Sequence, residues 1–76
     1  MKTSKIENVP NSILFQEMIE TNNLIREAMA FGDNEVFRAE GKKFQMLLEE
    51  TIKRDAIWHY EAAVREAAAA GELRYI

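Results

Sequence analysis

Residues that interrupt helices are scarce in this chain, and their scarcity constrains the fold more than any other feature. The 76 residues include one proline, Pro10, and three glycines, Gly32, Gly41 and Gly71. Proline is tolerated in the first turn of a helix, and glycine is favoured just after the last turn. Between these positions, apolar residues recur at the three- and four-residue spacing of a helix. The sequence therefore predicts an all-α protein.

A first amphipathic helix is predicted from about residue 10 to residue 31. Gly32 can end it in the left-handed conformation, and Asp33 can cap the helix that follows. Residues 1–9 lack periodicity and are predicted to form a flexible tail, which leaves residues 10–76 as a single helical domain. The apolar face of the first helix comprises Leu14, Met18, Thr21, Ile25, Ala28 and Met29, and its polar side comprises Gln16, Glu20, Asn23 and Glu27.

The pattern after Asp33 predicts a second and much longer helix over about residues 34–70. At about 1.5 Å per residue it would be about 55 Å long, so the first helix, at about 33 Å, could cover only part of it in a hairpin. An alternative is a three-helix bundle with a break near residues 53–55, in which Asp55 caps a third helix. We favour the continuous helix because no glycine or proline marks a break and Glu-to-base pairs at helical spacing span the region.

The second half of the long helix carries apolar residues on more than one side, so it needs more than one packing partner. A chain of 76 residues buries only about 60% of its unfolded surface and is marginally stable alone. It has no cysteine and one histidine, which excludes a disulfide and disfavours a structural zinc site. We therefore predict a homodimer that forms an antiparallel helical bundle. The predicted dimer interface comprises Trp58, Ala62, Ala63, Ala69, Asp55 and His59.

The contribution of Trp58 to stability can be estimated. If the Trp58 ring is buried, Trp58→Ala should cost about 3 kcal/mol of stability.

A second contact surface, for a different protein, is predicted on another side of the same helix. Apolar patches that include aromatic residues are typical of protein interaction sites. This partner surface comprises Met46, Ile57, Tyr60 and Val64.

Asp55 and His59 are the pair that most resembles a catalytic or metal-binding arrangement. They lie one turn apart on the predicted helix, and a carboxylate can orient an imidazole. Catalysis would also need a nucleophile and a metal site would need further ligands, and the sequence places neither beside this pair. We interpret the pair as a local contact at the dimer interface, with pH-dependent assembly as an alternative. We expect no enzymatic activity, no metal and no cofactor.

The charge and hydropathy of the chain argue against nucleic acids and membranes as binding partners. Thirteen acidic residues against ten basic ones give a net charge of −3, which argues against binding to nucleic acid through its phosphates. No apolar run reaches the roughly 18 residues of a membrane span. We therefore predict a cytoplasmic protein that does not bind membranes.

Together these patterns predict a non-enzymatic, homodimeric protein–protein interaction module that acts on an unidentified protein. Its role would be that of a small regulator, as an inhibitor, an adaptor or an assembly factor. Phage-type antagonists of host or defence complexes share this profile, which is an association only. The alternatives are a small helical nucleic-acid-binding protein and a subunit of a larger assembly.

Overall fold

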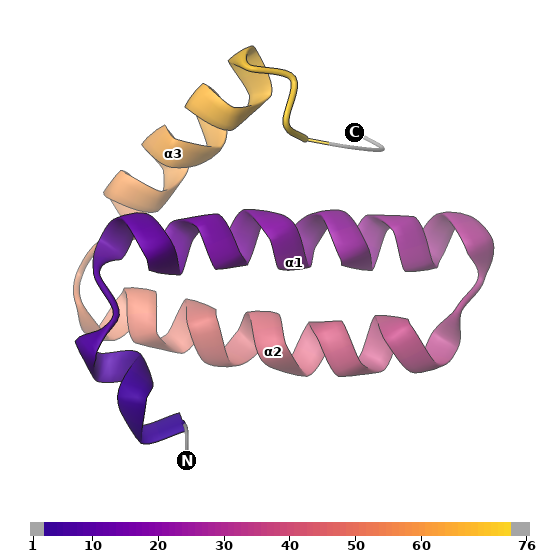
Figure 1. The fold of residues 1–76 in the computed structure, drawn as a ribbon, viewed down its shortest axis with the longest axis horizontal. Coiled ribbons are helices and arrows are strands. Elements are labelled where there is room, and N and C mark those ends of the chain that lie inside the picture. Colours follow the sequence, from indigo (N-terminus) through magenta and orange to yellow (C-terminus); the bar gives the residue numbers. More distant parts are fainter. Residues whose placement is uncertain (1–2, 74–76) are drawn as a thin grey trace.

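The computed structural model describes residues 3–73, with side chains from residue 6 onward. This part of the chain contains a 3₁₀ helix, η1 (Thr3–Asn8), and the α-helices α1 (Asn11–Phe31), α2 (Asn34–Lys53) and α3 (Ile57–Ala69). α1 and α2 form an antiparallel hairpin, and α3 leaves one end of the hairpin at an angle (Figure 1). The extents of 33 × 32 × 15 Å correspond to a single layer of helices, since a helix with side chains is about 10–12 Å across. The prediction of an all-α protein is confirmed.

The turn between α1 and α2 has the structure that its sequence predicts. Gly32 adopts the left-handed conformation, with a φ of 71°. The N–H of Asp33 donates to the carbonyl of Ala28 at 2.9 Å, which is the long hydrogen bond of a Schellman motif. The Asp33 carboxylate then accepts from the N–H of Val36 at 3.2 Å and caps α2.

The second helix is interrupted, so the prediction of one continuous helix over residues 34–70 is wrong. α2 ends at Lys53, and α3 begins at Ile57. Between them Asp55 has a φ of 56°, a left-handed conformation that aspartate adopts more easily than most residues other than glycine. The alternative, a break near residues 53–55, gives the helix boundaries correctly.

Asp55 ends α2, and this role differs from the one that the sequence predicts for it. Its N–H donates to the carbonyl of Ile52 at 2.9 Å, and the N–H of Ala56 donates to the carbonyl of Thr51 at 3.0 Å. These two bonds form a complete Schellman motif with aspartate in the place of glycine. The residue before α3 is Ala56, and it makes no side-chain capping bond. The break rotates α3 relative to α2, so the apolar face of α2 does not continue along α3.

The main core lies at the end of the hairpin where α1 begins and α2 ends. Leu14, Phe15 and Met18 of α1 pack there with Leu47 of α2 and with Ala56. α1 packs mainly against α2 and less extensively against α3. The partly buried side chains around this core are Ile6, Val9, Phe44, Leu48, Tyr60 and Ala63.

The segment before α1 is more regular than the flexible tail predicted for residues 1–9. Thr3–Asn8 forms η1, and Ile6 and Val9 pack against the core. An exposed ion pair between Lys53 and Glu7, at 3.3 Å, also joins this segment to α2. The described part of the segment therefore belongs to the folded domain.

Arg54 fixes this arrangement from the turn after α2. Its guanidinium donates to the Ile6 carbonyl, to Asn11 Oδ1 and to Glu50 Oε2, each at 2.8 Å. Glu50 and Arg54 are four residues apart, and their side chains are only 9% and 18% exposed. One arginine thus connects η1, the start of α1 and the end of α2.

Candidate functional site

Most residues predicted for the dimer interface lie on the outward face of α3. Trp58 is 77% exposed, and Ala62 and Ala69, at helical spacing from it, are exposed too. Ala63 instead packs against the core. The Trp58 ring is therefore not buried within one copy of the chain, so the loss predicted for Trp58→Ala does not apply to a monomer. The outward face of α3 remains the predicted place of association.

Asp55 and His59 are not held together as the predicted pair. Asp55 lies in the turn before α3, whereas His59 lies within the helix, and both are exposed. None of the hydrogen bonds and ion pairs found in the described residues joins them. The part of the chain that the structure describes contains no group of three His, Cys, Asp or Glu side chains able to hold a metal ion. The pair thus offers no catalytic or metal-binding geometry.

The predicted partner surface is divided by the break in the helix. Met46 is exposed on α2, whereas Ile57, Tyr60 and Val64 are half-buried on α3. The Tyr60 ring contacts the Phe15 ring, with centroids 5.9 Å apart. Burial of this ring raises the pKa of the Tyr60 hydroxyl. Tyr60 is therefore largely a core residue, and Met46 is not in line with the others.

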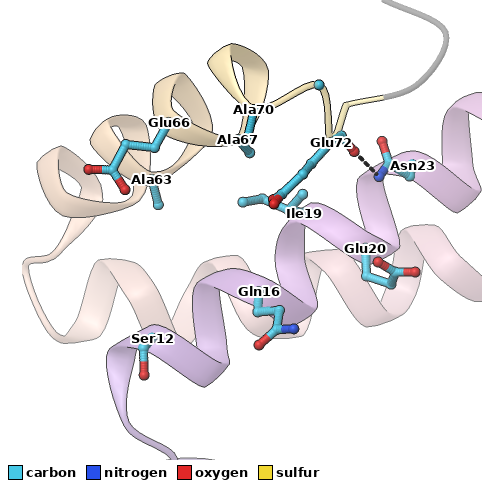
Figure 2. Close-up of a pocket in the computed structure, with 11 residues that line it drawn as sticks. Ser12, Gln16, Ile19, Glu20, Asn23, Ala63, Glu66, Ala67, Ala70 and Glu72 are labelled. Carbon is cyan, nitrogen blue, oxygen red and sulfur yellow. Dashed lines mark hydrogen bonds between the residues drawn. The ribbon is translucent and has the colours of Figure 1, made fainter.

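A cleft of about 840 Å³ lies between α1 and α3, and the sequence does not predict it (Figure 2). The α3 wall consists of small residues and one carboxylate, Glu66, and the α1 wall is mainly polar. Glu20 and Glu72 add further carboxylates, and none of the described residues that line the cleft is basic. The lining residues are Ser12, Gln16, Ile19, Glu20, Asn23, Ala63, Glu66, Ala67, Ala70, Gly71 and Glu72.

Asn23 closes the wide end of this cleft. Its side chain is only 2% exposed, and its Nδ2 donates to the Glu72 carbonyl at 3.0 Å (Figure 2). The sequence places Asn23 on the polar side of its helix, which is wrong because the C-terminal turn covers that side. Gly71 makes this turn with a φ of 75°. The bond joins residues 49 positions apart, and no local pattern signals it.

The turn between α1 and α2 carries a second, more apolar hollow, which we name the turn pocket. Its volume is about 270 Å³. Large apolar side chains are exposed around it, among them Phe31 at 73% and Met29 at 65%. The sequence places Met29 on the buried face, but no described element covers this end of the hairpin. The turn pocket is lined by Leu24, Glu27, Ala28, Phe31, Asp33 and Val36.

No protein-family model matches this chain, and neither curated proteins nor solved structures give a significant match to it. None of the described helices is long and apolar enough to cross a membrane. The functional interpretation therefore depends on the exposed surfaces of the three helices.

Proposed function

We propose that this protein is a non-enzymatic interaction module that acts as a homodimer and binds another protein. The exposure of large apolar side chains, above all that of Trp58, carries this proposal. Aromatic residues and methionine are enriched at protein interfaces, and tryptophan is among the commonest residues to dominate binding energy. Removing apolar surface from water contributes about 25 cal/mol per Å². The exposed large hydrophobic residues are Ile13, Met29, Phe31, Val36, Phe37, Met46, Ile52 and Trp58.

The single layer of helices supports the homodimer. Domains are usually built from at least two packed layers, because each helix must bury its apolar side against another element. With a thickness of 15 Å, one copy has no second layer to cover its broad faces. A second copy stacked on a broad face would supply that layer. The core of one copy is correspondingly small, and its buried hydrophobic residues are Leu14, Phe15, Met18, Ala28, Leu47, Ala56 and Ala67.

We assign the contact with a different protein to the rest of the predicted partner surface. Met46 is exposed on α2, and Ile57 and Val64 are partly exposed on α3. Tyr60 is left out of this surface because it packs on Phe15. A chain of this size that binds through apolar patches suits a small regulator, as an inhibitor, an adaptor or an assembly factor. A phage-type antagonist of a host or defence complex is one form of such a regulator.

Sedimentation equilibrium over about 1–100 µM tests the homodimer. We expect a dimer with a dissociation constant of about 1 µM, which corresponds to about −8 kcal/mol. A species of monomer mass throughout this range would contradict the homodimer.

Affinity capture with purified protein as bait tests the second contact. We expect a bound protein that is lost with Met46→Glu and retained with Glu49→Gln, a matched substitution at an exposed position one turn further along α2. Equal capture by both variants would remove Met46 from the partner surface.

A further inference from the structure

The tryptophan of the chain lies on the side of α3 that points away from α1. Tyr60, Ala63 and Ala67 mark the inner side of this helix, because they pack against the core or are buried. Trp58 lies on the opposite side and is 77% exposed. Three exposed residues follow it at intervals of four, three and four positions, which is the spacing of a helix-packing seam. We name this row the outer seam of α3, and it comprises Trp58, Ala62, Arg65 and Ala69.

Of the three α-helices, α3 packs least against the rest of the chain. Its inner side contacts α1, and Ala67 is its one buried residue. The C-terminal turn folds back toward α1, where the Glu72 carbonyl accepts from Asn23 (Figure 2). That turn is therefore on the other side of α3 from the outer seam. Because a helix with apolar residues on several sides packs against more than one neighbour, the outer seam is suited to contact a second molecule.

The outer seam is complementary to itself in size when two copies of α3 run antiparallel. A twofold axis that crosses the helix midway along the seam places Trp58 opposite Ala69 of the second copy, because both residues are equally far from the axis. The same axis places Arg65 opposite Ala62 of the second copy. Each large side chain thus meets a small one, so the two helices can interdigitate at the usual distance of about 8–10 Å. A parallel pair would instead place the tryptophans together and the alanines together.

The charges beside the outer seam are complementary in the same antiparallel arrangement. Glu61 is exposed on one flank of the seam, and the twofold axis brings it near Arg65 of the second copy. None of the ion pairs found in the described residues uses Glu61 or Arg65. His59 and Glu66 are seven residues apart and share the other flank, so the axis brings His59 near Glu66 of the second copy. A parallel pair would place each of these charges beside its own copy.

We propose that the homodimer forms by antiparallel packing of α3 against α3 of a second copy through the outer seam. The contact is isologous, so it closes at two copies and does not continue into a filament. A tryptophan buries about 150–250 Å², so the two Trp58 rings and the surfaces that they cover account for about 600–1,000 Å². This area is at the lower end for specific interfaces and is compatible with a micromolar dissociation constant. The inference rests on the proposed homodimer and names the surface that forms it.

The single tryptophan of the chain makes the contact directly measurable. As the wild-type protein is concentrated through its dissociation constant, we expect the Trp58 emission maximum to move to shorter wavelength in step with dimer formation. Trp58→Ala should raise the dissociation constant about thirtyfold, the effect of losing a tryptophan hot spot. An emission maximum that stays at the position of a solvated indole while the dimer forms would overturn the inference but leave the homodimer standing. A monomer at every concentration would overturn both.

Two charge reversals test the direction of the helices. In the antiparallel dimer, Glu61→Lys places two bases at each of the two flanking contacts, and Arg65→Glu places two acids there. Each variant should raise the dissociation constant about tenfold. Glu49→Lys is the matched control, because Glu49 is exposed on α2 and precedes the base Lys53 by four residues, as Glu61 precedes Arg65. It should leave the constant within about threefold of wild type. Equal weakening by Glu49→Lys and Glu61→Lys would mean that net charge is responsible, and the inference would be wrong.

Mixing the two charge-reversal variants gives the sharpest test. In a heterodimer of Glu61→Lys with Arg65→Glu, opposite charges meet at both flanking contacts. We expect the mixture to dimerise within about threefold of wild type, although each variant alone dimerises weakly. If neither variant alone weakens the dimer, the helices are parallel or another surface forms the contact, and the inference is wrong. If both weaken it and mixing restores nothing, the like charges act within α3 of each copy, and the inference is again wrong.

Discussion

The two ends of the α1–α2 hairpin are built from similar helix endings but differ in what covers them. At the first end, the turn through Gly32 joins α1 to α2, and Phe31 and Met29 remain exposed. At the second end, the turn through Asp55 leads into α3, and η1 and α3 pack against the core. We call the first end, where these large apolar side chains are exposed, the open end, and the second end, which η1 and α3 pack against, the closed end.

This difference shows that local helix signals and burial are separate properties. Both turns have the long hydrogen bond of a Schellman motif, from Asp33 to Ala28 at one end and from Ala56 to Thr51 at the other. What closes the second end is the set of long-range bonds from Arg54 and the packing of Tyr60 and Ala63. Substitutions at the two ends should therefore change the stability of the protein by different amounts and, in some cases, in opposite directions.

The largest effect should come from the closed end. Arg54→Ala removes three hydrogen bonds, to Ile6, Asn11 and Glu50, and leaves the buried Glu50 carboxylate without its partner. Breaking such a pair costs about 3 kcal/mol. We expect urea-induced unfolding, followed by circular dichroism at one fixed protein concentration, to show this loss.

Arg38→Ala is the control for Arg54→Ala. Arg38 is exposed on α2 near the open end, and substitutions at such positions usually change stability by less than about 0.5 kcal/mol. Equal losses for the two arginines would mean that the hydrogen bonds of Arg54 do not hold η1 and α1 to the end of α2.

At the open end, Gly32 should contribute to stability only through its backbone conformation. Gly32 has a φ of 71°, and a Cβ at this position would meet no atom within 4 Å. Gly32→Ala should therefore cost about 1 kcal/mol from backbone strain only. Gly41→Ala provides the contrast, because Gly41 lies inside α2 with equally open space. There alanine should add about 1 kcal/mol by its helix propensity. Thermal unfolding of the two variants should show shifts of opposite sign, and a shared sign would contradict this account.

The features that the sequence predicts correctly are local in the chain. The span of α1, its end at Gly32 and the cap at Asp33 depend on residues within one or two turns of each other, so composition and spacing reveal them. The break at Asp55 is local as well, but aspartate in the left-handed conformation is a much weaker signal than glycine. The sequence therefore favours the continuous helix, and it places the residues beyond 53 on faces that continue those of the preceding helix.

The candidate site depends on contacts that the sequence could not reveal. The sequence predicts Trp58 at an interface, and its exposure is compatible with that prediction. The turn pocket, by contrast, is lined by residues from the last turns of α1, the connecting turn and the first turn of α2, and no single periodic pattern in the sequence brings these residues together. The burial of Asn23 likewise follows from a bond to the distant residue Glu72.

A smaller effect, of opposite sign to that of Gly32→Ala, should be found at Asp55. Glycine adopts a positive φ without the strain that a side chain causes, although it loses more backbone entropy on folding. Asp55→Gly should therefore stabilise the protein by about 0.5 kcal/mol. The Asp55 side chain is exposed, so little packing is lost. Urea unfolding would contradict the assignment if Asp55→Gly were less stable than wild type.

The smallest effect at neutral pH should come from Tyr60, whose ring packs on Phe15 at the closed end. Burial raises the pKa of the Tyr60 hydroxyl above its ordinary value of 10.0, because the phenolate is poorly solvated there. A raised pKa in the folded state means that the stabilisation is complete below pH 10.0 and is lost as the pH rises through the folded-state value. Tyr60→Phe cannot ionise, so its stability should fall less steeply than that of wild type above about pH 10.

Urea unfolding of wild type and Tyr60→Phe at a series of pH values measures this difference. The two proteins should be nearly equal in stability at pH 7, because the ring and its contact with Phe15 are retained, and should diverge in the alkaline range. At the open end, Phe31 has no ionisable group, and Phe31→Tyr would place a hydroxyl on a side chain that is 73% exposed. That variant should therefore show the alkaline dependence of wild type. Parallel alkaline profiles for wild type and Tyr60→Phe would mean that Tyr60 is hydrated in solution, and that α3 does not close its end of the hairpin as the structure describes.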